Sequence, residues 1–274
     1  NSAKVIESGT VRQEDSSKIV PYIDIKLKGN SILKSQLIIL DILAHNDWKR
    51  PIYYVTGYHN DAFGLEEYFQ LEGLAYRLIP VRSENKSWVD YGRIDTDILY
   101  ENIMKKFVWG GANDRNVYID YNHNRTLTVV RARLQYAKLA KALAAEGKKD
   151  KALEVLDRCM DVLPPENVKY DPYYPDLIEA YFAAGNNEKA LKLTNDYCSY
   201  NYKHLDYYLS QSQYIISSAE YEIQSAIQYT SKVSTACMTY GARNLAEEID
   251  KKLETYYRDY LKTRIPEDQL PVSD

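Results

Sequence analysis

The feature that most constrains the fold is a helix-turn-helix pattern that occurs twice in the middle of the chain. The first copy, "YAKLAKALAAEGKKDKALEVLDRCMDVLP", runs from Tyr136 to Pro164. Small and apolar residues form one stripe on each of its two helices, and Gly147 supplies the turn between them. A second copy, from Tyr173 to Cys198, repeats the pattern with Gly185 at the turn. Paired helices of this kind bury one face against the next pair, so the copies predict an all-α array.

The order of residue types in these copies resembles the tetratricopeptide repeat, which places an aromatic, a Leu, a small residue, a Gly, an Ala and a closing Pro at similar spacings. Two further helices are predicted over residues 205–219 and 221–240. An amphipathic helix from Ala246 to Tyr260 would then cap the array with a polar outer face.

The residues before the repeats alternate between strand-like and helix-like stretches. This alternation predicts a small α/β domain of the β-α-β type. Ser31 and Asp95 are expected to cap two of its helices. The expected fold class is therefore α+β and mostly helical, with an α/β domain over 1–122 and tetratricopeptide-like repeats over 123–274. The predicted strands are 20–27, 51–55 and 72–81, and the predicted helices are 31–46, 64–71 and 95–109.

Composition and spacing narrow the classes of function. The formal net charge of -4 argues against a nucleic-acid partner, because such proteins present a basic face. No apolar run approaches the ~20 residues that a bilayer requires. No zinc pattern, nucleotide-binding motif or catalytic motif is present, so neither a cofactor nor a metal is expected. The thiols are interpreted as small buried helix residues, at Cys159, Cys198 and Cys237, and the histidines are scattered, at His45, His59, His123 and His204.

The stretch "LDILAHNDWKRPIYYV" joins a predicted helix to a predicted strand through a turn that contains a tryptophan, two cations and a proline. Pro51 suits the start of a strand. Trp48 is interpreted as covering the edge of the core, while Lys49 and Arg50 face water. The alternative is a ligand-binding corner. The candidate binding residues are Trp48, Arg50, Tyr68, Glu72, Arg77 and Asp97 in the first domain, and Tyr174 and Tyr208 in the second.

Four stretches together carry a resemblance to a known family. They are "LDILAHNDWKRPIYYV", "GLEEYFQLEGLAYRLIPV", "GRIDTDILYENIMKKFVWGG" and "LAKALAAEGKKDKALEVLDRCMDVLP". They resemble the C-terminal soluble region of large multi-pass membrane proteins, abundant in Bacteroidetes, known as domain-of-unknown-function family 2723. The membrane half of that family is similar to the GT-C glycosyltransferases, which include protein O-mannosyltransferases. The family's catalytic acid lies in that membrane half, so the resemblance implies no catalytic residue in this chain.

The resemblance implies a periplasmic domain of an inner-membrane protein, with the membrane helices of the same polypeptide as a partner. The main hypothesis is a non-catalytic accessory domain that binds acceptor protein or peptide, glycan or a partner protein beside a glycosyltransferase. The first alternative is a free-standing helical-repeat scaffold for protein–protein interactions. The second is a small hydrolase that uses a carboxylate pair, either Glu66 with Glu67 or Asp95 with Asp97.

Overall fold

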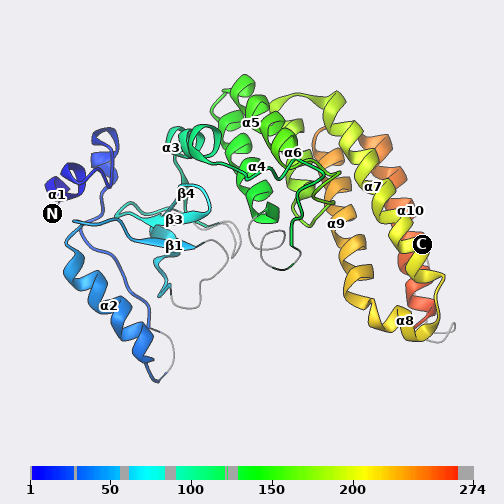
Figure 1. The fold of residues 1–274 in the computed structure, drawn as a ribbon, viewed down its shortest axis with the longest axis horizontal. Coiled ribbons are helices and arrows are strands. Elements are labelled where there is room, and N and C mark those ends of the chain that lie inside the picture. The colour runs from blue at the N-terminus through cyan, green and yellow to red at the C-terminus, as the bar shows by residue number, and fades with distance from the viewer. Residues whose placement is uncertain are drawn as a thin grey trace. The chain divides into compact units, whose positions relative to one another are not determined.

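The computed structural model describes residues 2–27, 30–55, 62–83, 91–120, 122 and 129–264. The chain divides into two compact units, Asn1–Phe107 (unit 1) and Val108–Asp274 (unit 2), drawn in Figure 1. A small mixed sheet belongs to unit 1, and long helices make up unit 2, so the α+β class is confirmed. The predicted junction between residues 122 and 123 adjoins residues outside the described part, and that division stays a prediction.

Unit 1 is built around a sheet with the strand order β1-β3-β2-β4. β3 is antiparallel to both of its neighbours, whereas β2 and β4 are parallel. In chain order, the elements of unit 1 are α1 (Ser2–Glu7), η1 (Gln13–Lys18), α2 (Lys34–Asn46), β1 (Tyr53–Val55), η2 (Leu65–Tyr68), β2 (Phe69–Leu71), β3 (Ala75–Leu78), β4 (Arg93–Ile94), α3 (Thr96–Tyr100) and the π-helical η3 (Glu101–Lys106).

The two faces of this sheet differ in chemistry, because successive side chains of a strand point to opposite faces. On one face the Phe69 ring is fully buried and lies 4.8 Å from the Tyr54 ring and 5.6 Å from the Tyr76 ring. These aromatic contacts join strands β1, β3 and β2. The other face carries one polar residue from each strand, paired in register; we call this set the polar row, and its members are Tyr53, Arg77, Gln70 and Arg93.

Several predicted elements of unit 1 differ from the structure. Residues 20–27 were expected to form a strand, but they form an extended segment whose neighbour Ile19 makes only an isolated bridge to Val81. The helix expected over 64–71 is a single 3-10 turn that leads directly into β2. The helix expected over 95–109 is α-helical only in α3 and continues as η3. Ser31 does not cap α2, because the helix begins three residues later.

Other predictions for unit 1 are confirmed. Asp95 caps α3, since its carboxylate accepts a hydrogen bond of 3.0 Å from the backbone N–H of Ile98. The helix predicted over 31–46 is α2, and the strand predicted after Pro51 is β1. Lys49 and Arg50 are exposed, as expected.

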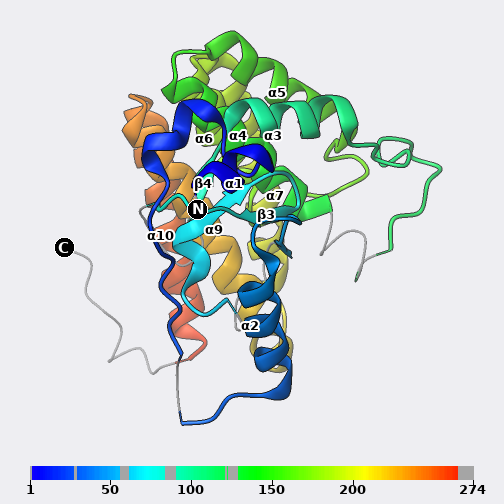
Figure 2. The same cartoon turned by 90° about the vertical axis from the view of Figure 1, so that its left-hand side faces the viewer.

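Unit 2 consists of packed helices, and the predicted helix pairs are present. α4 packs on α5 and α6, α6 on α7 and α9, and α9 on α10; Figures 1 and 2 show α9 and α10 side by side. Their bounds are α4 (Val130–Ala145), α5 (Lys149–Val162), α6 (Tyr174–Ala184), α7 (Asn187–Leu209), α8 (Gln213–Ser218), α9 (Glu220–Thr239) and α10 (Arg243–Lys262).

The predicted apolar stripes form the core of unit 2. Tyr136, Leu139 and Leu143 of α4 have almost no exposed surface, and Gly147 has the positive φ of +78° expected at a helix end. The three thiols are buried and unpaired, which confirms that they pack as small residues. The helix expected over 205–219 is divided, because α7 continues to Leu209 and α8 follows. The identification of these pairs as tetratricopeptide repeats stays a prediction.

Candidate functional site

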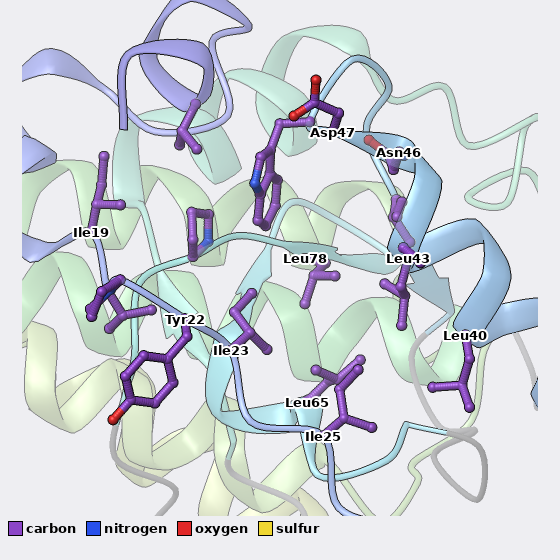
Figure 3. A pocket seen from close by; sticks show the side chains of 17 residues that line it. Ile19, Tyr22, Ile23, Ile25, Leu40, Leu43, Asn46, Asp47, Leu65 and Leu78 are labelled. Atoms are coloured by element: carbon purple, nitrogen blue, oxygen red, sulfur yellow. The ribbon is translucent and has the colours of Figure 1, made fainter. Parts of the chain in front are cut away.

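A pocket of about 500 Å³ lies within unit 1, between α2, the extended segment 19–25 and the apolar face of the sheet (Figure 3). α2 contributes Leu40 and Leu43, and the residues at the floor include Leu65 and Leu78. The opposite wall comes from the extended segment, whose pocket-lining side chains include Ile19, Tyr22, Ile23 and Ile25. The lining side chains are therefore mostly aliphatic, with the rings of Tyr22 and Trp48 among them.

The turn after α2 forms the upper end of this pocket. Asp47 and Trp48 both have left-handed backbone conformations, with φ of 48° and 61°. Such conformations cost about 1–2 kcal/mol each for residues with a Cβ, so this turn is held by its surroundings. The half-buried Trp48 packs against a buried apolar cluster made of Val5, Val11, Ile79 and Val81. Trp48 thus covers the edge of the core, as predicted, and it also lines the pocket.

Two polar side chains of the pocket come from the end of α2 and the turn after it. Asn46 and Asp47 lie at the end of α2, and the ammonium group of Lys4 is paired with the Asp47 carboxylate. The hydrogen bond from Lys4 keeps the pKa of Asp47 below its usual value. The paired carboxylate therefore stays ionised, beside lining side chains that are mostly apolar. Pockets of this size and lining bind apolar groups, with specificity set by a few polar atoms at the edge.

Two of the predicted binding residues, Glu72 and Arg77, meet on the polar face of the sheet, opposite the pocket. The Glu72 carboxylate lies 3.8 Å from the Arg77 guanidinium, accepts a hydrogen bond of 2.7 Å from the Tyr53 hydroxyl and another of 2.8 Å from the Gln70 amide. Burial and the bond to Glu72 raise the pKa of Tyr53 to about 12. Arg77 also donates to the Thr10 hydroxyl at 3.3 Å, which ties the N-terminal segment to the sheet.

Asp97 belongs to a neighbouring ion network that Arg12 organises. The Arg12 guanidinium lies 3.0 Å from Asp95 and 3.1 Å from Asp97. The other carboxylate pair considered for hydrolysis, Glu66 with Glu67, is not isolated either, because Glu67 bonds to Lys26 at 3.1 Å and Arg82 at 2.8 Å. Carboxylates held by guanidinium and ammonium groups are stabilised as anions, which suits a structural role better than proton transfer.

The remaining predicted residues lie apart from one another. Tyr68 is buried, and its hydroxyl accepts a bond of 3.5 Å from the Asp24 backbone. In unit 2, Tyr174 is fully buried, with its ring stacked on that of Tyr197 at 5.7 Å. The rings of Tyr68 and Tyr174 are therefore inaccessible to a ligand in this conformation. Tyr208 is half-buried beside His204 and Tyr207. The eight predicted residues thus do not form one site, and their binding roles stay predictions.

Sequence reasoning missed the residues that organise these clusters. Tyr53 and Gln70 could have been found from the alternation of polar and apolar side chains in "YYV" and "FQL", had the pairing of the strands been known. Arg133 was also missed, although it is three residues before Tyr136 on the buried stripe of α4. A cation at such a position signals a buried partner.

The described residues contain neither a metal-binding cluster nor a membrane-crossing helix. No three or more His, Cys, Asp and Glu side chains in the described part are grouped so as to hold a metal ion. Within the same residues, no helix combines the length and the apolar character needed to cross a membrane. His59 and His123 fall outside the described residues.

Most of unit 1 is similar in sequence to a named protein family. Searches of curated proteins and of solved structures found no match. Residues 1–98 match the family model described as TMEM260-associated domain 2. The relation to family 2723 and to the GT-C enzymes stays a prediction. All residues that line the apolar pocket, from Val5 to Pro80, lie inside the stretch that is similar to TMEM260-associated domain 2.

Proposed function

We propose that this chain is a non-catalytic, periplasmic accessory domain of a membrane-bound glycosyltransferase of the GT-C type, and that it acts by binding. The apolar pocket of unit 1 carries the proposal, since it is a preformed concave site lined from four directions. Two observations support the membrane setting: the match of residues 1–98 to TMEM260-associated domain 2, and the resemblance to family 2723.

The lining of the pocket favours a polypeptide over a glycan as its ligand. Sugar hydroxyls placed against Leu40, Leu43 and Leu78 would lose their hydrogen bonds to water without replacement. A large aliphatic or aromatic side chain would instead gain contact with the walls. Such a side chain could come from an acceptor protein or from a loop between the membrane helices of the same polypeptide.

The edge of the sheet gives such a polypeptide a second point of attachment. β1 is the first strand in the order β1-β3-β2-β4, and Ile52, next to it, lines the pocket. An extended peptide can add to a sheet edge through its backbone, with alternate side chains entering pockets beside it. We therefore propose an apolar side chain in the pocket and its backbone along β1.

The pocket can be tested by filling it. The probes are fluorescently labelled Gly/Ser peptides that carry one Leu, Phe or Trp, and matched peptides that carry Ser instead. We expect fluorescence anisotropy to show saturable binding of the apolar peptides only. Leu43→Trp should abolish it, because the indole would occupy the cavity. The control, Ile215→Trp on the exposed surface of α8, should bind like the unsubstituted chain.

Equal binding by Leu43→Trp and the unsubstituted chain, or no binding of any apolar peptide, would remove the pocket as the carrier of the function. Circular dichroism of each variant shows whether the fold is retained. The peptide with Ser gives the level of non-specific binding, so that weak general adhesion is not mistaken for occupancy of the pocket.

The membrane setting needs a separate experiment. An antibody raised against the 31.8 kDa chain would be used on membrane and soluble fractions of the source cells. We expect a much heavier band that is confined to the membrane fraction. A soluble band of the chain's own size would contradict the glycosyltransferase setting and favour the free-standing scaffold.

A further inference from the structure

α2 carries apolar residues over most of its surface, with Lys34, Asp41 and His45 along one polar stripe, yet none of its 13 residues is buried. Its inner face, with Leu40 and Leu43, borders the pocket, while Leu37, Ile38 and Ile42 are exposed. Apolar residues on so wide a face of a helix are normally enclosed, either by protein or by lipid. The exposed side of α2 therefore lacks the environment that its composition requires.

The exposure is concentrated at the N-terminal end of α2, which both views show extending away from the strands of unit 1 (Figures 1 and 2). Five aliphatic side chains in and before this end are between 39% and 63% exposed. We call them the apolar tip, and they are Leu27, Ile32, Leu33, Leu37 and Ile38. A projecting apolar tip of this size is more than the scattered exposure that is normal on a protein surface.

The charges around the apolar tip have one sign. Between Asp24 and Asp41 the sequence contains three lysines, at positions 26, 28 and 34, and no acidic residue. Lys34 is exposed, Lys26 is exposed and also pairs with Glu67 at 3.1 Å, and Lys28 lies outside the described residues. This local excess of positive charge occurs in a chain whose formal net charge is -4. Its placement beside apolar residues is the arrangement that binds anionic bilayers.

We propose that the apolar tip inserts into the headgroup region of an anionic lipid bilayer, with the neighbouring lysines at the level of the lipid phosphates. The aliphatic stem of Lys34 would lie along the apolar surface while its ammonium reaches the phosphates. Asp41 and His45, whose carboxylate and Nδ1 lie 3.2 Å apart further along α2, stay in water. The inference does not depend on the function proposed for the pocket.

Two other partners fit the tip less well. A second copy of the chain would bring two sets of lysines together without an anion between them, and like charges at an interface are repulsive. A helix-binding partner would need to supply the groove, because the tip is a projection and not a cleft. An anionic bilayer satisfies the apolar surface and the charge together.

The test is co-sedimentation of the complete chain with vesicles of phosphatidylcholine alone and with vesicles that also contain phosphatidylglycerol. We expect binding to the anionic vesicles only, and weaker binding as the ionic strength rises. The double variant Leu33→Glu/Leu37→Glu should lower the partition coefficient by at least about tenfold, because two inserted side chains are lost. The control, Tyr214→Glu/Tyr221→Glu, changes exposed aromatic residues of unit 2 and should bind normally.

A site-specific label keeps the test valid even if the double variant is unstable. The native thiols are buried, so a cysteine introduced by Ile38→Cys can be labelled selectively with an environment-sensitive dye. We expect its emission to shift to the blue on anionic vesicles, whereas the same dye at Tyr214→Cys should not shift. No binding to anionic vesicles, or equal binding by the tip and control variants, would overturn the proposal.

Two further outcomes separate this proposal from its alternatives. A concentration-dependent dimer that the tip variant abolishes, without vesicle binding, would show that a second copy covers the tip. Loss of peptide binding in Leu43→Trp with unchanged vesicle binding supports the tip independently of the pocket. Retained peptide binding with no vesicle binding would overturn the tip alone.

Discussion

Arg133 shows how a single charged side chain can organise a buried connection. It has no exposed surface, and its guanidinium bonds to Asp171 at 2.5 Å and to the carbonyl oxygens of Leu163, Val168 and Lys169 at 2.5–2.9 Å. These acceptors belong to the connection between α5 and α6, which would otherwise carry unsatisfied carbonyls into the core. The ring of Tyr174 lies against the same guanidinium, 5.3 Å from its centroid.

Replacing this arginine should destabilise unit 2 strongly. We expect Arg133→Met to lower the free energy of unfolding by about 3–5 kcal/mol, because the buried Asp171 carboxylate loses the guanidinium that balances its charge. Urea denaturation followed by circular dichroism measures the change. Arg158→Met, at an exposed position of α5, should cost little. Equal effects of the two substitutions would show that Arg133 does not hold the connection.

Asp15 makes the stability of unit 1 depend on pH. Hydrogen bonds from Lys18 and Arg93 lower the pKa of Asp15, against the opposing effect of burial. A lowered folded-state pKa stabilises the protein above the unfolded-state pKa of about 3.9, and that stabilisation is lost as the pH falls through the lower folded-state value.

We therefore expect Asp15→Asn to lower the melting temperature at pH 7, because the variant lacks the two charge-assisted bonds. The difference from the unsubstituted chain should shrink as the pH falls from about 5 to 2, where Asp15 itself becomes protonated. Thermal unfolding at several pH values measures this difference in melting temperature. Asp24→Asn, at an exposed position, is the control. A difference that stays constant with pH would contradict this linkage.

At the scale of elements, local patterns predicted the helices well and the strands poorly. The stripes of α4 and α10 repeat every three or four residues within one element, so periodicity alone identifies them. The strands depend on partners that the sequence does not specify. Residues 20–27 have strand composition but find no strand partner, and the "FQL" of β2 forms a strand because β3 and β4 lie on either side.

The residues of the candidate pocket could likewise be predicted from the sequence only in part. Trp48 was found because a tryptophan in a turn is conspicuous, and the structure places it at the pocket. The other walls come from segments far apart in the chain, such as Ile23 and Leu78, which only the fold brings together. The pairing of Glu72 with Arg77 could be suspected from their spacing, but Tyr53 joins them only through the register of β1 with β3.

The exposure of α2 should be visible in its dynamics. A helix of 13 residues with no buried side chain is marginal by itself. We expect its amide hydrogens to exchange much faster than those of α10, which has five buried residues. Hydrogen exchange with mass spectrometry measures both helices in one sample. Anionic vesicles should slow exchange in α2 only. Equal protection of α2 and α10 in water would contradict the expected faster exchange of α2.

For the whole molecule, the division into two compact units predicts separate unfolding transitions. Phe69→Ala removes the buried ring at the centre of the sheet and should cost about 3–5 kcal/mol in the transition of unit 1. Arg133→Met should shift only the transition of unit 2. Calorimetry of both variants tests this, and a shift of a single common transition by either substitution would show that the units unfold together.

The buried thiols have a consequence for how the chain must mature. Burial raises the pKa of Cys159 and of Cys198 to about 12, so in the folded protein both stay protonated and unreactive. Before folding, however, the three thiols are ordinary and accessible, and any pair of them can be oxidised. In an oxidising compartment, folding of unit 2 must therefore finish before oxidation. A slow-folding variant should accumulate misbridged chains whose thiols can no longer enter the core.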